Sequence, residues 1–145
     1  MSEIPSGPPL CPEASSVPHL LCVEDDPDIL SLLVLALETI GGLRVTSCTS
    51  GAEALALAPV LAPDLVLLDV MMPGMDGIET LARLRSDART RGLPVVFLTA
   101  KVQPQEIATY RRLGARGVIP KPFDPMRLAD QVRGYLGDDP NPIAL

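Results

Sequence analysis

Five short apolar runs alternate along the chain with longer segments whose apolar positions recur at helical spacing. The runs are rich in Val, Leu and Ile and end in polar residues, Gly or Pro, which is typical of strands buried on both faces of a parallel sheet. They cover residues 19–23, 43–48, 65–69, 95–98 and 118–119. The segments between them predict amphipathic helices over 27–40, 52–61, 77–86, 105–113 and 125–136. This alternation predicts an α/β fold, a parallel sheet with helices on both faces.

Local signals mark where several of these helices begin and end. Gly41 and Gly42 are expected to stop the first helix. Ser50 is placed as the N-cap of the second helix, and Glu53, three residues later, completes a capping-box pattern. Pro125 suits the first turn of the last helix, because its ring favours the helical φ angle.

The composition is that of a single folded domain. The chain has 145 residues, 47% of them hydrophobic, with a mean hydropathy of +0.28, which is far from the disordered class. A net charge of −6 argues against non-specific binding to nucleic acid, which depends on clustered Lys and Arg. No apolar stretch reaches the roughly 18 residues of a membrane span, and no secretory signal pattern is present. We therefore expect a cytoplasmic protein without membrane insertion.

Three regions are expected along the chain. Residues 1–18 hold five prolines among Ser and Gly, which predicts an extended, disordered leader. Residues 19–137 form the folded domain, and 138–145 form a short polar tail, so no output domain of its own is expected. Cys11, Cys22 and Cys48 lack metal-ligand spacing, which favours reduced thiols, buried where they fall in apolar runs.

Polar residues close four of the apolar runs; they are Glu24, Asp25, Asp26, Asp69, Thr99 and Lys121. Because parallel strands open their carboxyl ends on one edge of a sheet, we expect these side chains to share one crevice. Adjacent carboxylates repel unless a cation offsets them, and hard oxygen ligands favour Mg²⁺. Helix capping is the alternative explanation for acids in this turn, and it applies best to Asp26 and Asp28.

Asp69 is the candidate nucleophile of this crevice. An acid at the end of a buried apolar strand loses its hydration, which costs free energy. Such an acid is therefore expected where its charge has a function. Beside a bound cation, its carboxylate can attack phosphorus and form an aspartyl phosphate. Lys121 can neutralise the transferring oxygens, and Thr99 can donate its hydroxyl to one of them. A cis peptide bond between Lys121 and Pro122 is a further hypothesis, since X-Pro bonds adopt cis at modest cost.

Four motifs occur in the order typical of one family. They are Val-Glu-Asp-Asp at 23–26, Leu-Leu-Asp-Val-Met-Met-Pro-Gly-Met-Asp-Gly at 67–77, Leu-Thr-Ala at 98–100 and Lys-Pro-Phe at 121–123. Over residues 19–136 the chain resembles the receiver domain of bacterial two-component response regulators, in their single-domain, CheY-like form. The resemblance implies a flavodoxin-like three-layer sandwich: a five-stranded parallel sheet of order 2-1-3-4-5 flanked by five helices.

The resemblance also implies a phosphoacceptor site. Asp69 would take a phosphoryl group from a phosphohistidine of a sensor histidine kinase or a phosphotransfer protein. Asp25 would ligate Mg²⁺ directly and Glu24 mainly through water, with Asp69 and the backbone carbonyl of Met71 as further ligands. Mn²⁺ could substitute for Mg²⁺.

Thr99 and Lys121 would contact the phosphoryl oxygens. Movement of Thr99 would then drag the following loop and the helix at 105–113, and change how the surface around residues 100–133 binds an unknown downstream protein. No turnover enzyme is expected, because the chain would accept a phosphoryl group and only slowly lose it.

Some positions depart from the usual pattern of the family. Members commonly carry Tyr or Phe three residues before the lysine, where this chain has Val118, which is small and stiff at χ1. We therefore expect a switch that relies on backbone and loop movement, with Tyr110 as the nearby exposed aromatic side chain. Met71 and Lys101 stand where the family tunes hydrolysis of the phosphoaspartate. Met71 cannot act as a base, so we expect slow self-dephosphorylation.

The helices and strand near the C-terminus carry a group of arginines that does not match the acidic–basic pairs of the usual family dimer; they are Arg111, Arg112, Arg116, Arg127 and Arg133. A solvated face and a surface for an acidic partner both explain them. We expect a monomer or a weak dimer.

Three other functions remain as alternatives. A phosphorylation-independent protein-binding module could keep the same fold, although such modules usually lose the acceptor, an acid or the lysine. A phosphatase of haloacid dehalogenase type would need a second Asp where this chain has Met71. A flavin-binding flavodoxin would need a Gly-rich or hydroxyl-rich phosphate loop at 24–26, where the acidic residues would repel phosphate.

Overall fold

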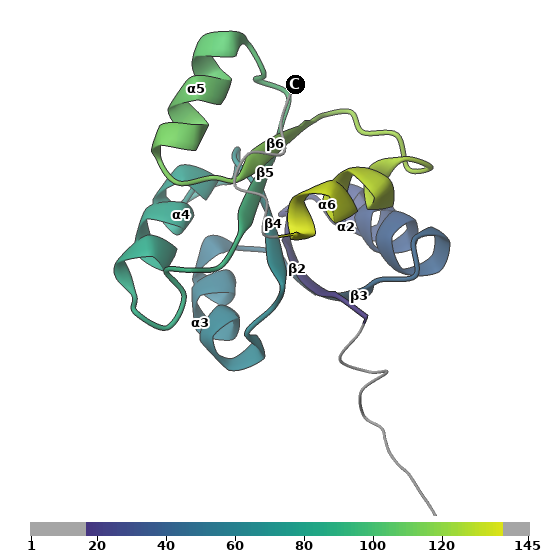
Figure 1. Ribbon diagram of the computed structural model, residues 1–145, viewed down its shortest axis with the longest axis horizontal. Coiled ribbons are helices and arrows are strands. Elements are labelled where there is room, and N and C mark those ends of the chain that lie inside the picture. The colour runs from purple at the N-terminus through teal and green to yellow at the C-terminus, as the bar shows by residue number, and fades with distance from the viewer. Residues whose placement is uncertain (1–16, 138–145) are drawn as a thin grey trace, which may run out of the picture.

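The sheet has the predicted topology. The computed structural model describes residues 17–137, and within them five parallel strands lie in the order β3-β2-β4-β5-β6 (Figure 1). The strands are β2 (His19–Val23), β3 (Arg44–Cys48), β4 (Leu65–Asp69), β5 (Val95–Thr99) and β6 (Gly117–Pro120). In chain order this is 2-1-3-4-5, so the flavodoxin-like three-layer fold is confirmed. Each strand end lies within one residue of its predicted position.

Helices cover both faces of the sheet. They are α2 (Pro27–Val34), the π-helix η1 (Leu35–Ile40) that continues it, α3 (Gly51–Leu61), α4 (Gly77–Ser86), α5 (Pro104–Arg112) and α6 (Leu128–Leu136). Figure 1 shows α2 and α6 on one side of the sheet and α3, α4 and α5 on the other. Alternate residues of each strand point to opposite sides, so Leu20 and Cys22 join the first apolar layer and Leu21 and Val23 the second.

The strands differ in how far they are buried. Every residue of β4 and β5 is buried, as expected for central strands between two helical layers. The prediction of burial on both faces is wrong for β3, in which only Cys48 is buried. β3 is an edge strand with a neighbour on one side only, and its exposed positions carry the polar residues Arg44 and Ser47. The other edge strand, β6, is apolar and stays buried except at Pro120.

Most helix-end signals operate as predicted. The Asp26 carboxylate accepts hydrogen bonds from the backbone N–H groups at the start of α2, and η1 ends at Gly41. Ser50 caps α3 by accepting from the N–H of Glu53 at 3.1 Å. The second half of the predicted capping box is wrong, because the Glu53 carboxylate instead accepts from the N–H and the hydroxyl of Thr49.

The last helix begins three residues later than predicted, at Leu128 rather than Pro125. Asp124 is the cause. Its carboxylate accepts from the N–H of Met126 at 2.9 Å, and its carbonyl accepts from the N–H groups of Arg127 and Leu128. These bonds close a turn over residues 125–127, so α6 starts after the turn.

The predicted leader, apart from residues 17 and 18, and the predicted tail lie outside the described residues, as does Cys11. Cys22 and Cys48 are both free and buried. Burial raises the pKa of both thiols, that of Cys48 to about 11. Within 17–137 no helix is both long enough and apolar enough to cross a membrane.

The strand register determines which polar residues meet at the carboxyl edge. Val23 pairs with Leu68, so Glu24 follows at the level of Asp69. Asp69 pairs with Leu98, which places Thr99 one step beyond it. Thr99 in turn pairs with Pro120, and Lys121 comes next.

Candidate functional site

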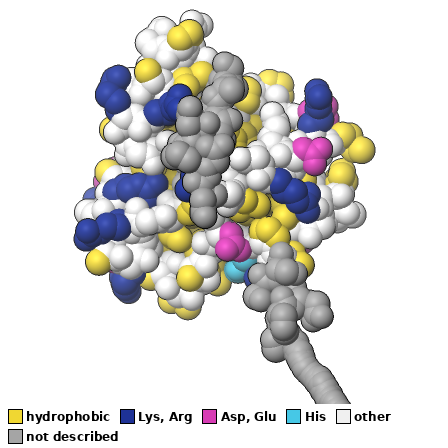
Figure 2. All heavy atoms as spheres, viewed as in Figure 1, with side chains coloured by type: hydrophobic (Ala, Val, Ile, Leu, Met, Phe, Trp, Pro, Cys, Tyr) yellow, Lys and Arg dark blue, Asp and Glu magenta, His cyan; other side chains and the backbone are white. Residues whose placement is uncertain are grey.

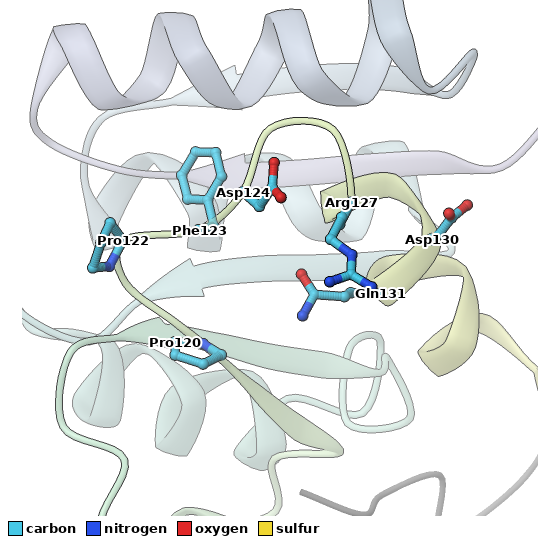
Figure 3. A pocket seen from close by; sticks show the side chains of 7 residues that line it. All are labelled: Pro120, Pro122, Phe123, Asp124, Arg127, Asp130 and Gln131. Carbon is cyan, nitrogen blue, oxygen red and sulfur yellow. The ribbon is translucent and has the colours of Figure 1, made fainter.

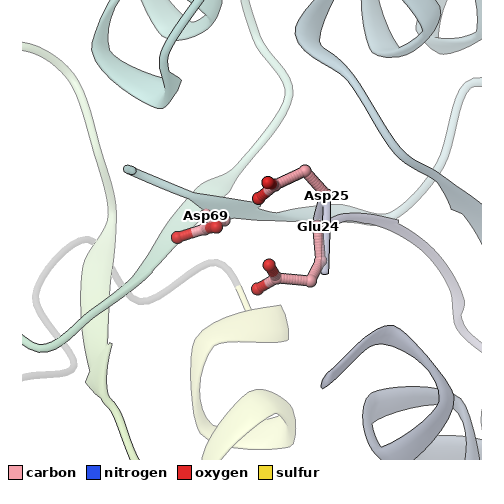
Figure 4. A group of neighbouring side chains, drawn as sticks. All are labelled: Glu24, Asp25 and Asp69. Carbon is pink, nitrogen blue, oxygen red and sulfur yellow. The ribbon is translucent and has the colours of Figure 1, made fainter. Parts of the chain in front are cut away.

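Three carboxylates form the centre of the site. One oxygen from each of Glu24, Asp25 and Asp69 lies within 4.8 Å of the others (Figure 4). Glu24 and Asp69 are each only 1% exposed, whereas Asp25 is partly exposed. Buried carboxylates so close together repel one another unless a positive charge compensates them. The site therefore needs a cation.

Lys121 supplies one compensating charge. Its Nζ lies 3.0 Å from Oε1 of Glu24 and 3.2 Å from Oδ1 of Asp69. The Lys121–Pro122 peptide bond is cis, as hypothesised from the sequence. Burial lowers the pKa of the Lys121 ammonium, but contacts with the two carboxylates outweigh burial, so its pKa is raised. The ammonium is therefore charged over the whole physiological pH range.

One carboxylate oxygen of Glu24 lacks a hydrogen bond. Its Oε2 accepts from the N–H of Asp26 at 3.1 Å. Its Oε1 is buried, and its contact with the ammonium is an ion pair without hydrogen-bond geometry. Burial raises the pKa of Glu24 to about 7, although the ammonium of Lys121 opposes the shift. A buried oxygen without a hydrogen bond, beside two further hard oxygen donors, fits a divalent cation such as Mg²⁺.

Asp69 is held from two directions. Its Oδ1 accepts from the Lys121 ammonium and from the N–H of Met71 at 3.2 Å. The side chain of Met71 is 61% exposed and supplies no acid or base. Gly77 allows α4 to start against this strand end, because an added Cβ would lie 2.4 Å from the carbonyl oxygen of Asp69.

Thr99 lies at the neighbouring strand end and is 1% exposed. Its Oγ1 accepts a hydrogen bond from the N–H of Lys101 at 3.0 Å. Its backbone carbonyl accepts from the N–H of Lys121 at 2.9 Å, which ties β5 to the lysine. Since Oγ1 acts as an acceptor toward Lys101, its own proton can be donated to a group bound in the site.

The prediction that Tyr110 is exposed is wrong, because the residue is only 5% exposed. Its ring packs edge-on against Phe97 at a centroid distance of 5.1 Å, in the same apolar layer as Val118. Its hydroxyl donates to the backbone carbonyl of Lys101 at 3.2 Å. The available signal was the three-residue spacing from Ile107, which places both side chains on the face of α5 that packs on the sheet.

Two of the predicted arginines make hydrogen bonds to backbone carbonyl groups of distant segments. Arg116 donates to the carbonyl oxygens of Tyr135 and Gly137 at the end of α6, and Arg133 donates to that of Gly41 at 2.7 Å. Figure 2 shows further Lys and Arg side chains over α4 and α5. Arginines occupy the last turn of both helices, where they compensate the helix dipole. A surface for an acidic partner stays a prediction.

A hollow of about 610 Å³ lies on the chain segment that follows Lys121 (Figure 3). Its lining comes from the end of β6, the loop after it and the first turn of α6; the residues are Pro120, Pro122, Phe123, Asp124, Arg127, Asp130 and Gln131. No residue of the acidic cluster lines it. It therefore lies beside the site and is not a second part of it.

Comparison with known proteins gives one consistent result. The family model of the response regulator receiver domain matches residues 20–133. The DNA-binding dual master transcriptional regulator RpaA of Synechocystis is 39% identical over 120 residues, which make up 83% of this chain and 49% of RpaA. The chain thus spans about half the length of the curated relatives that it matches.

Solved structures agree with this match. Chemotaxis protein CheY4 of Vibrio cholerae has a TM-score of 0.77 at 29% identity, covering 83% of this chain and 99% of CheY4. The receiver domain of sensor histidine kinase PA1611 from Pseudomonas aeruginosa has a TM-score of 0.74 at 25% identity, covering 84% and 99%. That structure holds a magnesium ion coordinated in its active-site cleft.

Proposed function

Because this chain belongs to the response regulator receiver domain family, we propose that it is the phosphoacceptor switch of a two-component phosphorelay. One observation carries the proposal: Asp69 ends a fully buried strand among two further carboxylates and the ammonium of Lys121. Buried, closely spaced ionisable groups of this kind cluster at functional sites. The function that we propose for this site is phosphorylation of Asp69.

In the proposed step, a carboxylate oxygen of Asp69 attacks the phosphorus of a phosphohistidine. The P–O bond forms, the P–N bond breaks, and its electron pair returns to the imidazole nitrogen, which takes up a proton. Lys121 stabilises the negative charge on the transferring oxygens. Thr99 donates its hydroxyl proton to one of these oxygens. The donor is a sensor histidine kinase or a phosphotransfer protein.

Magnesium is the proposed cofactor, and Mn²⁺ can replace it. Glu24, Asp25, Asp69 and the carbonyl of Met71 would hold the ion, which supplies positive charge against the phosphoryl oxygens when bound. The buried oxygen of Glu24 that lacks a hydrogen bond supports this assignment, and so does the magnesium ion in the PA1611 receiver domain. The set consists of hard oxygen donors only.

The proposed signal is a change of surface. A phosphoryl group adds about −1.5 to −2 charge and three strong acceptors to the site. Thr99 is hydrogen-bonded to Lys101, the second residue of the loop that leads into α5. A displacement of Thr99 would therefore move this loop and the start of α5. The surface around residues 100–133, with the hollow after Lys121, would then bind a downstream protein differently.

We propose no catalytic turnover. Met71, two residues after the acceptor, offers no group that could activate water. Lys101 is exposed beside Thr99 and can pair with phosphate. The phosphoaspartate should therefore be long-lived, and loss of the phosphoryl group within seconds would contradict this part of the proposal.

The test is intact-protein mass spectrometry after incubation with acetyl phosphate, with and without Mg²⁺. The variant is Asp69→Asn, and the matched control is Asp64→Asn, which changes an exposed acid just before β4, at the end of that strand opposite Asp69. We expect one Mg²⁺-dependent phosphoryl adduct on the native chain and on the control, and none on Asp69→Asn. Absence of an adduct on the folded native chain would favour a phosphorylation-independent binding module instead.

A further inference from the structure

Two hydrogen bonds connect Thr99 to helix α5 through a single residue. Lys101 donates its N–H to Oγ1 of Thr99 at 3.0 Å, and its carbonyl accepts from the hydroxyl of Tyr110 at 3.2 Å. Lys101 lies in the loop between β5 and α5, which has no regular structure of its own. Both backbone groups of this residue are therefore held from outside the loop.

Tyr110 is a rigid anchor for this link. The side chain is 5% exposed, and its ring is fixed edge-on against Phe97 at an interplanar angle of 69°. A buried phenol hydroxyl needs a hydrogen-bond partner, and the carbonyl of Lys101 provides it. Because Phe97 belongs to the buried inner strand β5, Tyr110 is fixed relative to the sheet and not to the loop.

The direction of the first bond matters for the chemistry. The N–H of Lys101 points at the lone pair of Thr99 Oγ1, which leaves the threonine proton for an acceptor in the site. The N–H and the carbonyl of Lys101 belong to two successive peptide units that share its Cα. Holding the carbonyl through Tyr110 restrains the position of that Cα, and so the place from which the N–H donates to Thr99. This restraint reduces the orientations open to the threonine hydroxyl.

We infer that Tyr110 is a positioning residue for the phosphoryl group: it holds Lys101, and Lys101 orients the hydroxyl of Thr99. The inference rests on the proposed function and adds a residue to it. Through these two hydrogen bonds, α5 is connected to the hydroxyl of Thr99 in the site. Val118 is buried in the same apolar layer as Tyr110 and Phe97.

The test removes one hydroxyl at a time. Tyr110→Phe keeps the ring and its packing and deletes the bond to Lys101. Tyr135→Phe is the matched control, because its hydroxyl is also buried and donates to a backbone carbonyl, that of Val118 at 3.4 Å, which lies outside this link. Thermal unfolding of both variants serves to exclude general damage to the fold.

The first readout is the affinity for beryllium fluoride, a stable mimic of the phosphoryl group, measured by calorimetry with Mg²⁺. Loss of one neutral hydrogen bond corresponds to about a three- to tenfold change. We expect Tyr110→Phe to bind beryllium fluoride weaker by this factor and Tyr135→Phe to stay within about twofold of the native chain. In the Thr99→Ala background, Tyr110→Phe should have no further effect, since both act through one hydroxyl.

The second readout needs no ligand. Hydrogen exchange of the Lys101 amide should be faster in Tyr110→Phe than in the native chain and unchanged in Tyr135→Phe. Equal exchange rates, equal or tighter binding by Tyr110→Phe, or an effect that persists without the threonine hydroxyl would each overturn the inference. Failure of the native chain to form the Mg²⁺-dependent adduct would instead overturn the proposed function, so the two failures are distinguishable.

Discussion

Replacement of Lys121 by methionine should destabilise the metal-free protein strongly. The ammonium lies 3.0 Å from Glu24 Oε1 and 3.2 Å from Asp69 Oδ1, and both acids are 1% exposed. At an effective dielectric constant of about 20, each contact between full charges corresponds to an attraction of about 5 kcal/mol. Because the pKa of Glu24 is about 7, the comparison is made at pH 8, where this carboxyl is mostly ionised. The hydration that the lysine lost on folding offsets part of this attraction.

The net effect follows from what the substitution leaves behind. Removing one member of a buried charge pair typically costs about 3–5 kcal/mol, because the remaining charge has no partner. The Lys121 side chain is 21% exposed, so water compensates part of the loss, and we expect about 3 kcal/mol. Lys101→Met, which removes an exposed lysine of the neighbouring loop, should change stability by less than about 0.5 kcal/mol.

The assay is urea unfolding followed by far-ultraviolet circular dichroism, since the chain has no Trp to report fluorescence. Each protein is measured with EDTA and with Mg²⁺. We expect Mg²⁺ to raise the unfolding midpoint of Lys121→Met more than that of the native chain, because the ion replaces the missing positive charge. If Lys121→Met with EDTA resembles Lys101→Met, the ammonium does not compensate the carboxylates and the reasoning is refuted.

Three further predictions concern the same framework. Gly77→Ala should lower stability by about 1–3 kcal/mol in urea unfolding, because the added Cβ would overlap the backbone of Asp69; unchanged stability would show that α4 can shift freely. Asp25→Asn should abolish the stabilisation of the folded chain by Mg²⁺ in thermal melts, and a melt that still responds to Mg²⁺ would remove Asp25 from the metal site. In a Cys11→Ser background, thiol reagents at pH 8 should react about 100-fold more slowly with native than with urea-unfolded protein, because the raised pKa of Cys48, about 11, leaves little thiolate; rapid labelling of the native form would contradict its burial.

The predicted site came from one physical rule. Strands of a parallel sheet end on a common edge, so residues that close separate apolar runs can be assigned to one place before any contact is known. Glu24, Asp69, Thr99 and Lys121 satisfy the rule, and the register of β2, β4, β5 and β6 brings their strand ends together. The helix ends with local signals, such as Asp26 and Ser50, were predictable for a similar reason, because capping bonds span only two or three residues.

Where the predictions were wrong, the sequence offered competing local hydrogen bonds, or the outcome depended on packing between elements. Glu53 had two possible partners next to each other, and only the folded loop shows that its carboxylate bonds to Thr49. The start of α6 depended on the turn that Asp124 closes. Tyr110 was predicted to be exposed, although its spacing from Ile107 places it on the inner face of α5, where it packs edge-on against Phe97.

Apolar periodicity and strand-end chemistry thus determined the fold class and the residues of the acidic crevice, whereas the strand order was implied by the family resemblance alone. The tertiary structure alone decided how these residues are paired: the ammonium of Lys121 between two carboxylates, the oxygen of Glu24 that lacks a hydrogen bond and the link from Thr99 to Tyr110. The physical reason is range. Periodicity and capping depend on residues a few positions apart, whereas charge pairing and side-chain burial depend on segments that only the packed sheet and helices bring together.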